Sequence, residues 1–266
     1  MIFSVIGIGN MGQALVSGFL REGVLKAEDI RICDSDAGKV SSFSELTGCA
    51  AYTSASEAVA GADYVLLCVK PQVIDRTVTD FLPALSASAV IISIAASVKI
   101  ARLRGLVHKS SPIVRVMPNT PALVGAAVNA VCFDSVNEEN MAFVLSLLET
   151  CGLVVPCDEK MLDAIGSVSG TGPAFVMLFI ESLADAAVRL GVPRTTALEI
   201  AAMTVYGSGK LAVETKLHPA ILKDQVCSPG GTTIEGVLAL EKHGLRAAVE
   251  AAVAAADEKT HLLAGG

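Results

Sequence analysis

Short, continuous apolar runs alternate with segments of helical periodicity along the first 157 residues. Runs of this kind are typical of parallel strands buried on both faces, and the segments between them carry the apolar stripe of a packed helix. The expected strands are residues 2–6, 30–33, 63–69, 89–94, 113–117, 125–133 and 153–156. The expected helices are residues 11–20, 37–46, 56–60, 72–82, 98–106 and 137–151. The alternation predicts an α/β fold, with βαβ repeats in one sheet over residues 1–157.

The pattern changes after residue 157, because no further strand is indicated. Helical segments follow at residues 160–165, 174–190, 195–211, 219–226, 234–242 and 245–263, and several of them are apolar on more than one face. We therefore expect an all-α C-terminal domain over residues 158–266. So much apolar surface indicates contact with a partner subunit.

A glycine-rich loop joins the first expected strand to the first helix. Its sequence is Gly7-Ile8-Gly9-Asn10-Met11-Gly12, the G-x-G-x-x-G spacing of a dinucleotide-binding fingerprint. The first glycine makes the turn, the second lets the backbone approach a pyrophosphate, and the third lets helix and strand pack closely. The N-terminal domain is therefore expected to be of the Rossmann type and to bind NADPH or NADH through these six residues.

Asp34 ends the second expected strand, where a ribose-binding carboxylate belongs. A carboxylate at this point accepts hydrogen bonds from a 2′-hydroxyl and repels a 2′-phosphate. The nearest cation downstream is Lys39, and no arginine follows directly. The pattern favours NADH slightly over NADPH, and an exposed loop acid without a ligand is the alternative.

Three further strand ends carry candidate ligand-binding residues, because the carboxyl edge of an open α/β sheet faces its ligand. Val69-Lys70-Pro71 provides either a cation at the nucleotide crevice or a solvated lysine. Ala95 and Ala96 are small enough for a flat ring to approach, although a tight turn needs small residues too. Asn119 stands between two prolines in a rigid turn and is a candidate substrate contact.

The second domain carries a loop suited to a small anion, Ser228-Pro229-Gly230-Gly231-Thr232-Thr233. The proline fixes one φ angle, and the glycines adopt angles closed to other residues. Such a loop directs backbone N–H groups and two hydroxyls to one spot at the positive end of a helix dipole. A carboxylate would fit there, and a purely structural helix start is the alternative.

Composition narrows the class of protein. The net charge of −7 gives no basic face for nucleic acid and no polybasic membrane anchor. No apolar run reaches the roughly 20 residues of a membrane helix, and no secretory signal opens the chain. The seven cysteines have no Cys-x-x-Cys spacing, and no Cys/His cluster indicates a metal site. A cytoplasmic protein with reduced cysteines and without metal is expected.

The acids and bases near these loops restrict the reaction. None of the four histidines lies in a glycine-rich loop. Reduction of a ketone needs a proton donor such as His, Lys or Tyr, whereas a protonated imine brings its own proton. An anion-binding loop, a hydroxyl and a nicotinamide suffice to reduce a cyclic imine that carries a carboxylate. The alternative is a site that also contains a general acid from another part of the chain.

The chain resembles pyrroline-5-carboxylate reductases essentially from end to end. The similarity rests on the glycine-rich loop and on the blocks Val69–Gln72, Arg115–Pro121, Ser169–Ala174 and Leu222–Thr233, of which the last is highly specific to that family. The resemblance implies hydride transfer from NAD(P)H to the C=N bond of 1-pyrroline-5-carboxylate. The product is L-proline, in the last step of proline biosynthesis.

The resemblance also implies roles for individual residues. The substrate carboxylate would be held by the residues that match the family's loop, Ser228, Gly230, Gly231, Thr232 and Thr233. The Thr233 hydroxyl would lie near the ring nitrogen and is the catalytic candidate. The nucleotide would lie on the first loop, on Val69–Pro71 and on Ala95 and Ala96, with Gln225 approaching it. The family's helical domains interlock as dimers, which often assemble into rings, so the resemblance implies a homodimer through the helical domain and possible assembly of dimers into a ring.

Two alternatives remain. A β-hydroxyacid dehydrogenase has a similar two-domain plan, but its catalytic lysine would fall on Val176 and its amide on Ile180. A non-catalytic NAD(P)-binding regulator would not need the intact Ser228–Thr233 loop. Some relatives have a neutral or basic residue at the position of Asp34, which leaves the choice between the two nicotinamides open.

Overall fold

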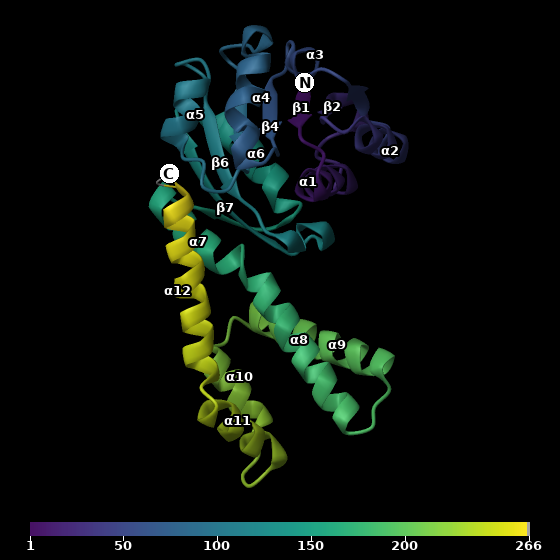
Figure 1. The fold of residues 1–266 in the computed structure, drawn as a ribbon, viewed down its shortest axis with the longest axis vertical. Coiled ribbons are helices and arrows are strands. Elements are labelled where there is room, and N and C mark those ends of the chain that lie inside the picture. The colour runs from purple at the N-terminus through teal and green to yellow at the C-terminus, as the bar shows by residue number, and fades with distance from the viewer. Residues whose placement is uncertain (265–266) are drawn as a thin grey trace. The chain divides into compact units, whose positions relative to one another are not determined.

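The computed structural model describes residues 1–264, which form two compact units. The first unit contains Met1–Gly170 and the chain from Asp257 onward, and the second contains Thr171–Ala256. Figure 1 shows that the first unit is a sheet covered by helices and that the second is helical throughout. The predicted α/β fold with a helical C-terminal part is confirmed.

The first unit is built on an eight-stranded sheet in the order β3-β2-β1-β4-β5-β6-β7-β8. The strands are β1 (Phe3–Ile6), β2 (Ile30–Cys33), β3 (Ala50–Tyr52), β4 (Tyr64–Leu67), β5 (Val90–Ser93), β6 (Ile113–Met117), β7 (Ala127–Asp134) and β8 (Gly152–Pro156). The order reverses between β1 and β4. Doubly wound sheets bind their ligands beside such a switch point, outside the carboxyl ends of the strands.

Two features depart from the predicted βαβ repeat. Strand β3 is not predicted by the sequence, because its three residues at the edge of the sheet are too short a stretch to indicate a strand. Strand β7 runs antiparallel to β6, whereas the other neighbouring pairs are parallel. Only the short 3₁₀ helix η4 (Thr120–Val124) connects β6 to β7, and a parallel crossover needs a longer connection.

Helices on both faces of the sheet create two separate cores. Alternate residues of a strand point to opposite faces, so Phe3 and Val5 pack in one core while Ile6 packs in the other. The first core includes side chains from α1 (Asn10–Arg21), α2 (Ala37–Thr47) and α6 (Glu138–Glu149). The second includes side chains from α3 (Ala55–Val59), α4 (Ile74–Phe81) and α5 (Ile100–Leu106). Short 3₁₀ helices occupy Ala27–Asp29 (η1), Pro71–Val73 (η2) and Leu82–Ala84 (η3).

Helix α7 (Glu159–Ser169) belongs to the first unit, although the sequence places the domain boundary before it, between residues 157 and 158. Arg115 of β6 is 2% exposed, and its guanidinium donates to Glu159 Oε1 at 2.9 Å and to Asp163 Oδ1 at 2.7 Å. Ser167 donates to Asp257 of α12 (Leu245–Ala264) at 2.9 Å. The Arg115 bonds attach α7 to the sheet and the Ser167 bond attaches it to α12, so the compact units divide after this helix.

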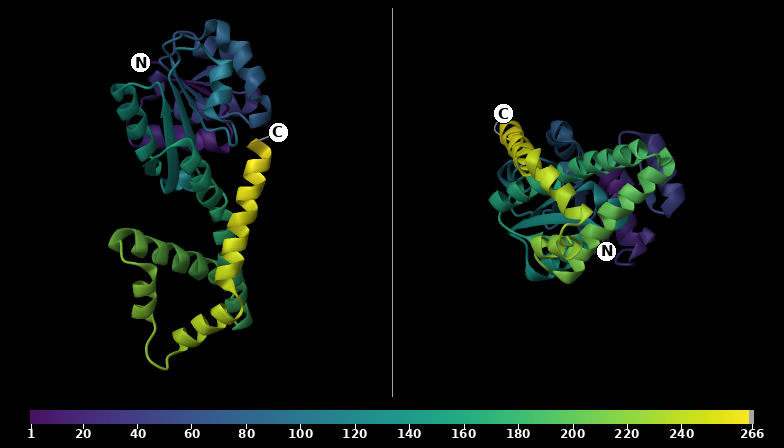
Figure 2. Two further views of the ribbon diagram at one scale, coloured as in Figure 1. Left: turned by 90° about the vertical axis from the view of Figure 1, so that its left-hand side faces the viewer. Right: turned by 90° about the horizontal axis from the view of Figure 1, so that it is seen from below.

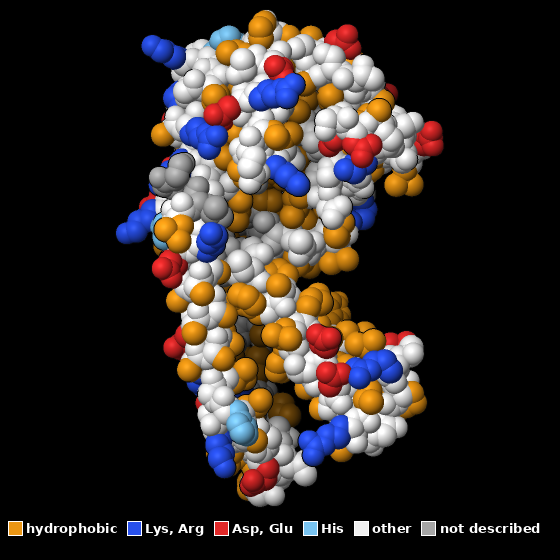
Figure 3. Space-filling view, viewed as in Figure 1, with side chains coloured by type: hydrophobic (Ala, Val, Ile, Leu, Met, Phe, Trp, Pro, Cys, Tyr) orange, Lys and Arg blue, Asp and Glu red, His pale blue; other side chains and the backbone are white. Residues whose placement is uncertain are grey.

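The second unit consists of α8 (Gly172–Arg189), α9 (Arg194–Thr215), α10 (Pro219–Val226), α11 (Thr232–Lys242) and the first part of α12. Helices α8 and α9 pack against each other through Ala184, Ala197 and Ala201, near the loop that joins them, and Figure 2 shows the two helices diverging from that loop. Large apolar side chains on both helices stay exposed, among them Met177 and Met203, and Figure 3 shows such side chains in orange. Within residues 1–264, one helical stretch, Glu159–Arg189, is long and apolar enough to cross a membrane by length and composition alone.

Candidate functional site

The glycine-rich loop has the geometry of a dinucleotide cradle. Gly7 adopts φ +103°, and a Cβ atom there would lie 2.7 Å from the Cys68 carbonyl, because the end of β4 passes beside the turn. A Cβ atom at Gly12 would collide with the Gly7 carbonyl oxygen, so only glycine lets α1 start this close to the sheet. Gly9 is the N-cap of α1, provides no side-chain cap, and has open space where a Cβ would be. Uncapped amides with open space beside them fit the pyrophosphate of a dinucleotide.

Asp34 is attached to this loop by hydrogen bonds. Its Oδ2 accepts from the Ile8 amide at 2.7 Å, and its Oδ1 accepts from the Asp36 amide at 2.9 Å. Lys39 pairs with Asp36 at 3.5 Å. The Asp34 carboxylate is therefore fixed beside the glycine loop, at the point where the ribose of a dinucleotide belongs.

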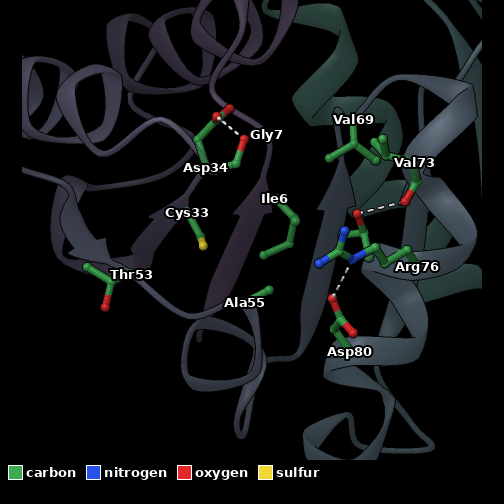
Figure 4. Close-up of a pocket in the computed structure, with 12 residues that line it drawn as sticks. Ile6, Gly7, Cys33, Asp34, Thr53, Ala55, Val69, Val73, Arg76 and Asp80 are labelled. Atoms are coloured by element: carbon green, nitrogen blue, oxygen red, sulfur yellow. Dashed lines mark hydrogen bonds and ion pairs between the residues drawn. The ribbon is translucent and has the colours of Figure 1, made fainter.

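A cleft of about 410 Å³ opens at the carboxyl ends of β1, β2 and β4 (Figure 4). Three predicted cofactor residues line it together, Gly7, Asp34 and Val69. The sequence pattern does not single out the other lining residues, which include Ser35, Thr53, Ala55, Val73, Arg76 and Thr77. The signal for those on α4 was available, because the first turns of a helix that follows a strand's carboxyl end face the same edge as the glycine loop.

The cysteines beside the cleft carry no negative charge at neutral pH. Burial, with smaller contributions from the charges of Asp34 and Glu57, raises the pKa of the Cys33 thiol. Burial also raises the pKa of Cys68. A thiol with a raised pKa is a poor nucleophile, so binding is the function that suits this edge of the sheet.

The remaining strand ends lie at the same edge. Lys70 is exposed and precedes η2, which begins at Pro71. Ala95 is buried and Ala96 is exposed in the turn after β5, where Ser97 adopts φ +62°. Non-glycine residues held in the left-handed region store about 1–3 kcal/mol of strain and occur often at binding sites. Cofactor contact by these residues stays a prediction.

Asn119 makes structural bonds that the sequence did not reveal. Its side chain is buried, its Nδ2 donates to the Ser169 carbonyl at 2.9 Å, and its Oδ1 accepts from the Val128 amide at 2.9 Å. It thereby connects the end of β6 to the last turn of α7 and to β7. These bonds explain a buried amide without a ligand, and a contact with substrate stays a prediction.

The loop of the second unit leads into α11, which begins at Thr232, two residues earlier than the sequence predicted. Gly230 adopts φ +67°, and the Gly231 amide donates to the Ser228 carbonyl at 3.0 Å. Gly231 is the N-cap of α11, and no side chain among the described residues caps the helix. Thr232 and Thr233 are exposed in this uncapped first turn, and Gln225 is exposed on α10.

Helix α1 of the first unit and helix α11 of the second therefore both start at a glycine N-cap without a side-chain cap. The unsatisfied amides of a helix start and the positive end of its dipole favour an anion. The loop before α1 has the form that a pyrophosphate needs. The loop before α11, residues 227–231, leads directly into the hydroxyls of Thr232 and Thr233, which suits a small carboxylate.

Comparisons with known proteins agree with this arrangement. A family model described as pyrroline-5-carboxylate reductase dimerisation matches residues 159–263, and one described as NADP oxidoreductase, coenzyme F420-dependent, matches residues 2–97. The pyrroline-5-carboxylate reductase of Escherichia coli (strain K12) is 39% identical over 259 residues, which cover 97% of this chain and 96% of the relative. The pyrroline-5-carboxylate reductase of Arabidopsis thaliana is 39% identical over 262 residues, which cover 97% of this chain and 94% of the relative.

A solved structure has nearly the same fold over the whole chain. The crystal structure of Plasmodium falciparum pyrroline carboxylate reductase with NADP bound has a TM-score of 0.89 at 32% identity, and the match covers 99% of this chain and 98% of that one. Identity at this level over nearly the full length of the relatives is decisive. The chain belongs to the pyrroline-5-carboxylate reductase family.

Proposed function

We propose that this chain reduces 1-pyrroline-5-carboxylate to L-proline with NAD(P)H, the last step of proline biosynthesis. Family membership supports the assignment, and the uncapped start of α11 behind Gly230 and Gly231 is the structural observation that carries it. The substrate presents one carboxylate. A helix start with unsatisfied amides, a positive dipole and two adjacent hydroxyls would bind that group.

The reaction places few demands on the protein's acids and bases. The nicotinamide, when bound, supplies a hydride to the imine carbon. The iminium nitrogen arrives protonated, loses its charge as the C–H bond forms, and takes its second proton from water. The α11 start would hold the carboxylate, and the Thr233 hydroxyl would hydrogen-bond to the ring nitrogen. No strongly acidic side chain is needed, in agreement with the neutral thiols beside the cleft.

NADH is the better cofactor in this proposal. Asp34 is fixed beside the loop by the Ile8 and Asp36 amides, and Asp36 is the next acid. Lys39, the nearest cation downstream, pairs with Asp36. A 2′-phosphate placed here would meet negative charge, whereas a 2′-hydroxyl would donate to Asp34.

The helical unit forms the subunit contact in this proposal. Its exposed apolar side chains lie in the range matched by the dimerisation model, and Glu159–Arg189 falls inside that range too. We therefore assign this stretch to a second copy of the chain rather than to lipid. Assembly of dimers into a ring, a cytoplasmic location and the lack of nucleic-acid binding complete the proposal, and the net charge of −7 supports the last of these.

The alternatives fit less well. Oxidation of a β-hydroxyacid by that enzyme family's lysine would require the position of Val176, an apolar residue of α8. A regulator that only binds NAD(P) would not need the glycine-led start of α11.

Steady-state assays on the purified chain test the function. Oxidation of NADH is expected with 1-pyrroline-5-carboxylate and not with a β-keto acid, and L-proline should accumulate in equal amount. A protein that binds NADH but oxidises it with neither substrate would be the regulator. Light scattering on the same sample gives the number of subunits.

A further inference from the structure

The cleft beside the glycine loop contains a cation that the proposed reaction does not use. Among the described residues that line it, Arg76 of α4 is the only Lys or Arg, and its side chain is 88% exposed. Its Nε lies 3.8 Å from Asp80, a long, solvent-exposed pair of the kind that contributes little stability. Figure 4 shows the guanidinium reaching from α4 into the cleft on the side of Ile6 and Ala55. The structure thus gives Arg76 no strong partner of its own.

The geometry of the cleft identifies what Arg76 would meet. If the pyrophosphate lies on the glycine loop and the ribose at Asp34, the base attached to that ribose must occupy the rest of the cleft. Ala55, Val69 and Val73 give that part an apolar lining. A flat, hydrophobic purine suits such a lining, and Arg76 lines the same space.

The chemistry of the side chain favours contact with the base over contact with a phosphate. A guanidinium is planar and weakly hydrated, so it stacks on aromatic faces. A 2′-phosphate would lie at the ribose, beside the fixed charge of Asp34, whereas Arg76 comes from the facing helix.

We propose that Arg76 stacks on the adenine of the bound dinucleotide and sets the affinity for the adenosine half of the cofactor, whatever its 2′ substituent. The proposal rests on dinucleotide binding, as part of the proposed function, and not on the reduction of an imine. Arg76 is then a binding residue that contacts the cofactor far from the reacting carbon.

Equilibrium binding to the purified full chain tests the proposal. NADH and NADPH are titrated by fluorescence, and AMP is measured by competition, on wild type and Arg76→Ala. The matched control is Arg102→Ala, because Arg102 is an exposed arginine of the neighbouring α5 that pairs with Asp75 at 2.9 Å and does not line the cleft. Arg76→Ala should lower the affinity for NADH, for NADPH and for AMP by one common factor, about two- to thirtyfold. Arg102→Ala should bind all three ligands with the same affinity as wild type.

A probe without the adenosine half separates this contact from a general loss of structure. Reduced nicotinamide mononucleotide should support the same kcat/KM in Arg76→Ala as in wild type. Unchanged binding of NADH and AMP in Arg76→Ala would overturn the proposal, as would a loss confined to NADPH, which would make Arg76 a reader of the 2′-phosphate. The binding measurements with NADH, NADPH and AMP need no substrate, so they decide the question even for a chain that fails to reduce pyrroline-5-carboxylate.

Discussion

The Ile8 amide donates a hydrogen bond to Asp34 Oδ2 at 2.7 Å, across 26 positions of sequence. The bond joins the glycine loop after β1 to the end of β2, so Asp34 both supports the loop and places a negative charge beside it. These two roles can be separated. Asparagine keeps a side-chain oxygen that accepts from Ile8 and has no charge, whereas serine is too short to do the same.

Asp34→Asn should raise the ratio of kcat/KM for NADPH to that for NADH. Loss of one partly screened repulsion with a 2′-phosphate is worth on the order of 1 kcal/mol, so a change of about fivefold is expected. Steady-state kinetics with both cofactors measure it. Asp34→Ser should also weaken binding of both cofactors, because the bond to the loop is lost, and an unchanged ratio in both variants would remove Asp34 from the choice of cofactor.

Thr233→Ala should lower kcat roughly ten- to a thousandfold, as the loss of one positioned hydrogen-bonding group in an active site can. Thr232→Ala is the matched control, because both threonines are exposed in the uncapped first turn of α11. Loss of Thr232 should act mainly on the KM for the imine. Equal, small effects of the two substitutions would mean that the backbone alone makes the site.

The glycine-rich loop could be predicted from the sequence because the residues that give it its shape are adjacent in the chain. Gly7 and Gly12 have the close contacts that the predicted turn and helix packing require, and Gly9 has open space beside it. Strand β3 was missed because three edge residues carry no pattern. Arg76 was missed because a lone arginine on a helix is normally a solvated surface residue, and only the shape of the cleft distinguishes it.

The compact units divide after α7, whereas the sequence places the domain boundary before it, close to residue 159, where the matched dimerisation model begins. Arg115 is a single charged residue in an apolar strand, and its partners Glu159 and Asp163 lie 44 and 48 residues further along the chain. No local pattern indicates that a helix so distant closes onto the sheet. The same holds for Asn119, whose bonds to Val128 and Ser169 depend on the folded positions of β7 and α7.

Arg115→Met should destabilise the first unit by about 3–5 kcal/mol, because it leaves Glu159 and Asp163 at a partly buried position without their cation. Urea unfolding at pH 7 measures the change. Arg102→Ala, which breaks the exposed pair with Asp75, should cost less than about 1 kcal/mol. Similar losses in the two variants would mean that the Arg115 cluster contributes no more than a surface ion pair.

Alkaline pH should weaken the fold through Cys132. Burial, followed by the charge of Glu159, raises the pKa of this thiol to about 11, although nearby Arg115 opposes the shift. The unfolded chain ionises the thiol near its ordinary pKa of about 8.5, whereas the folded chain retains the proton. The neutral thiol's contribution is therefore complete below about pH 8.5 and is lost as the pH rises to about 11, with a slope of at most about 1.4 kcal/mol per pH unit.

The Cys132→Ala variant isolates the effect of thiol ionisation on the free energy of unfolding. The variant leaves a small cavity whose cost does not depend on pH, so the difference in unfolding free energy between wild type and variant should narrow from pH 8 to pH 11. Urea titrations at several pH values in this range, with a reductant present, measure it, and other alkaline groups cancel in the difference. A difference in unfolding free energy that stays constant or widens from pH 8 to pH 11 would mean that the Cys132 thiol ionises in the folded protein as readily as in the unfolded chain.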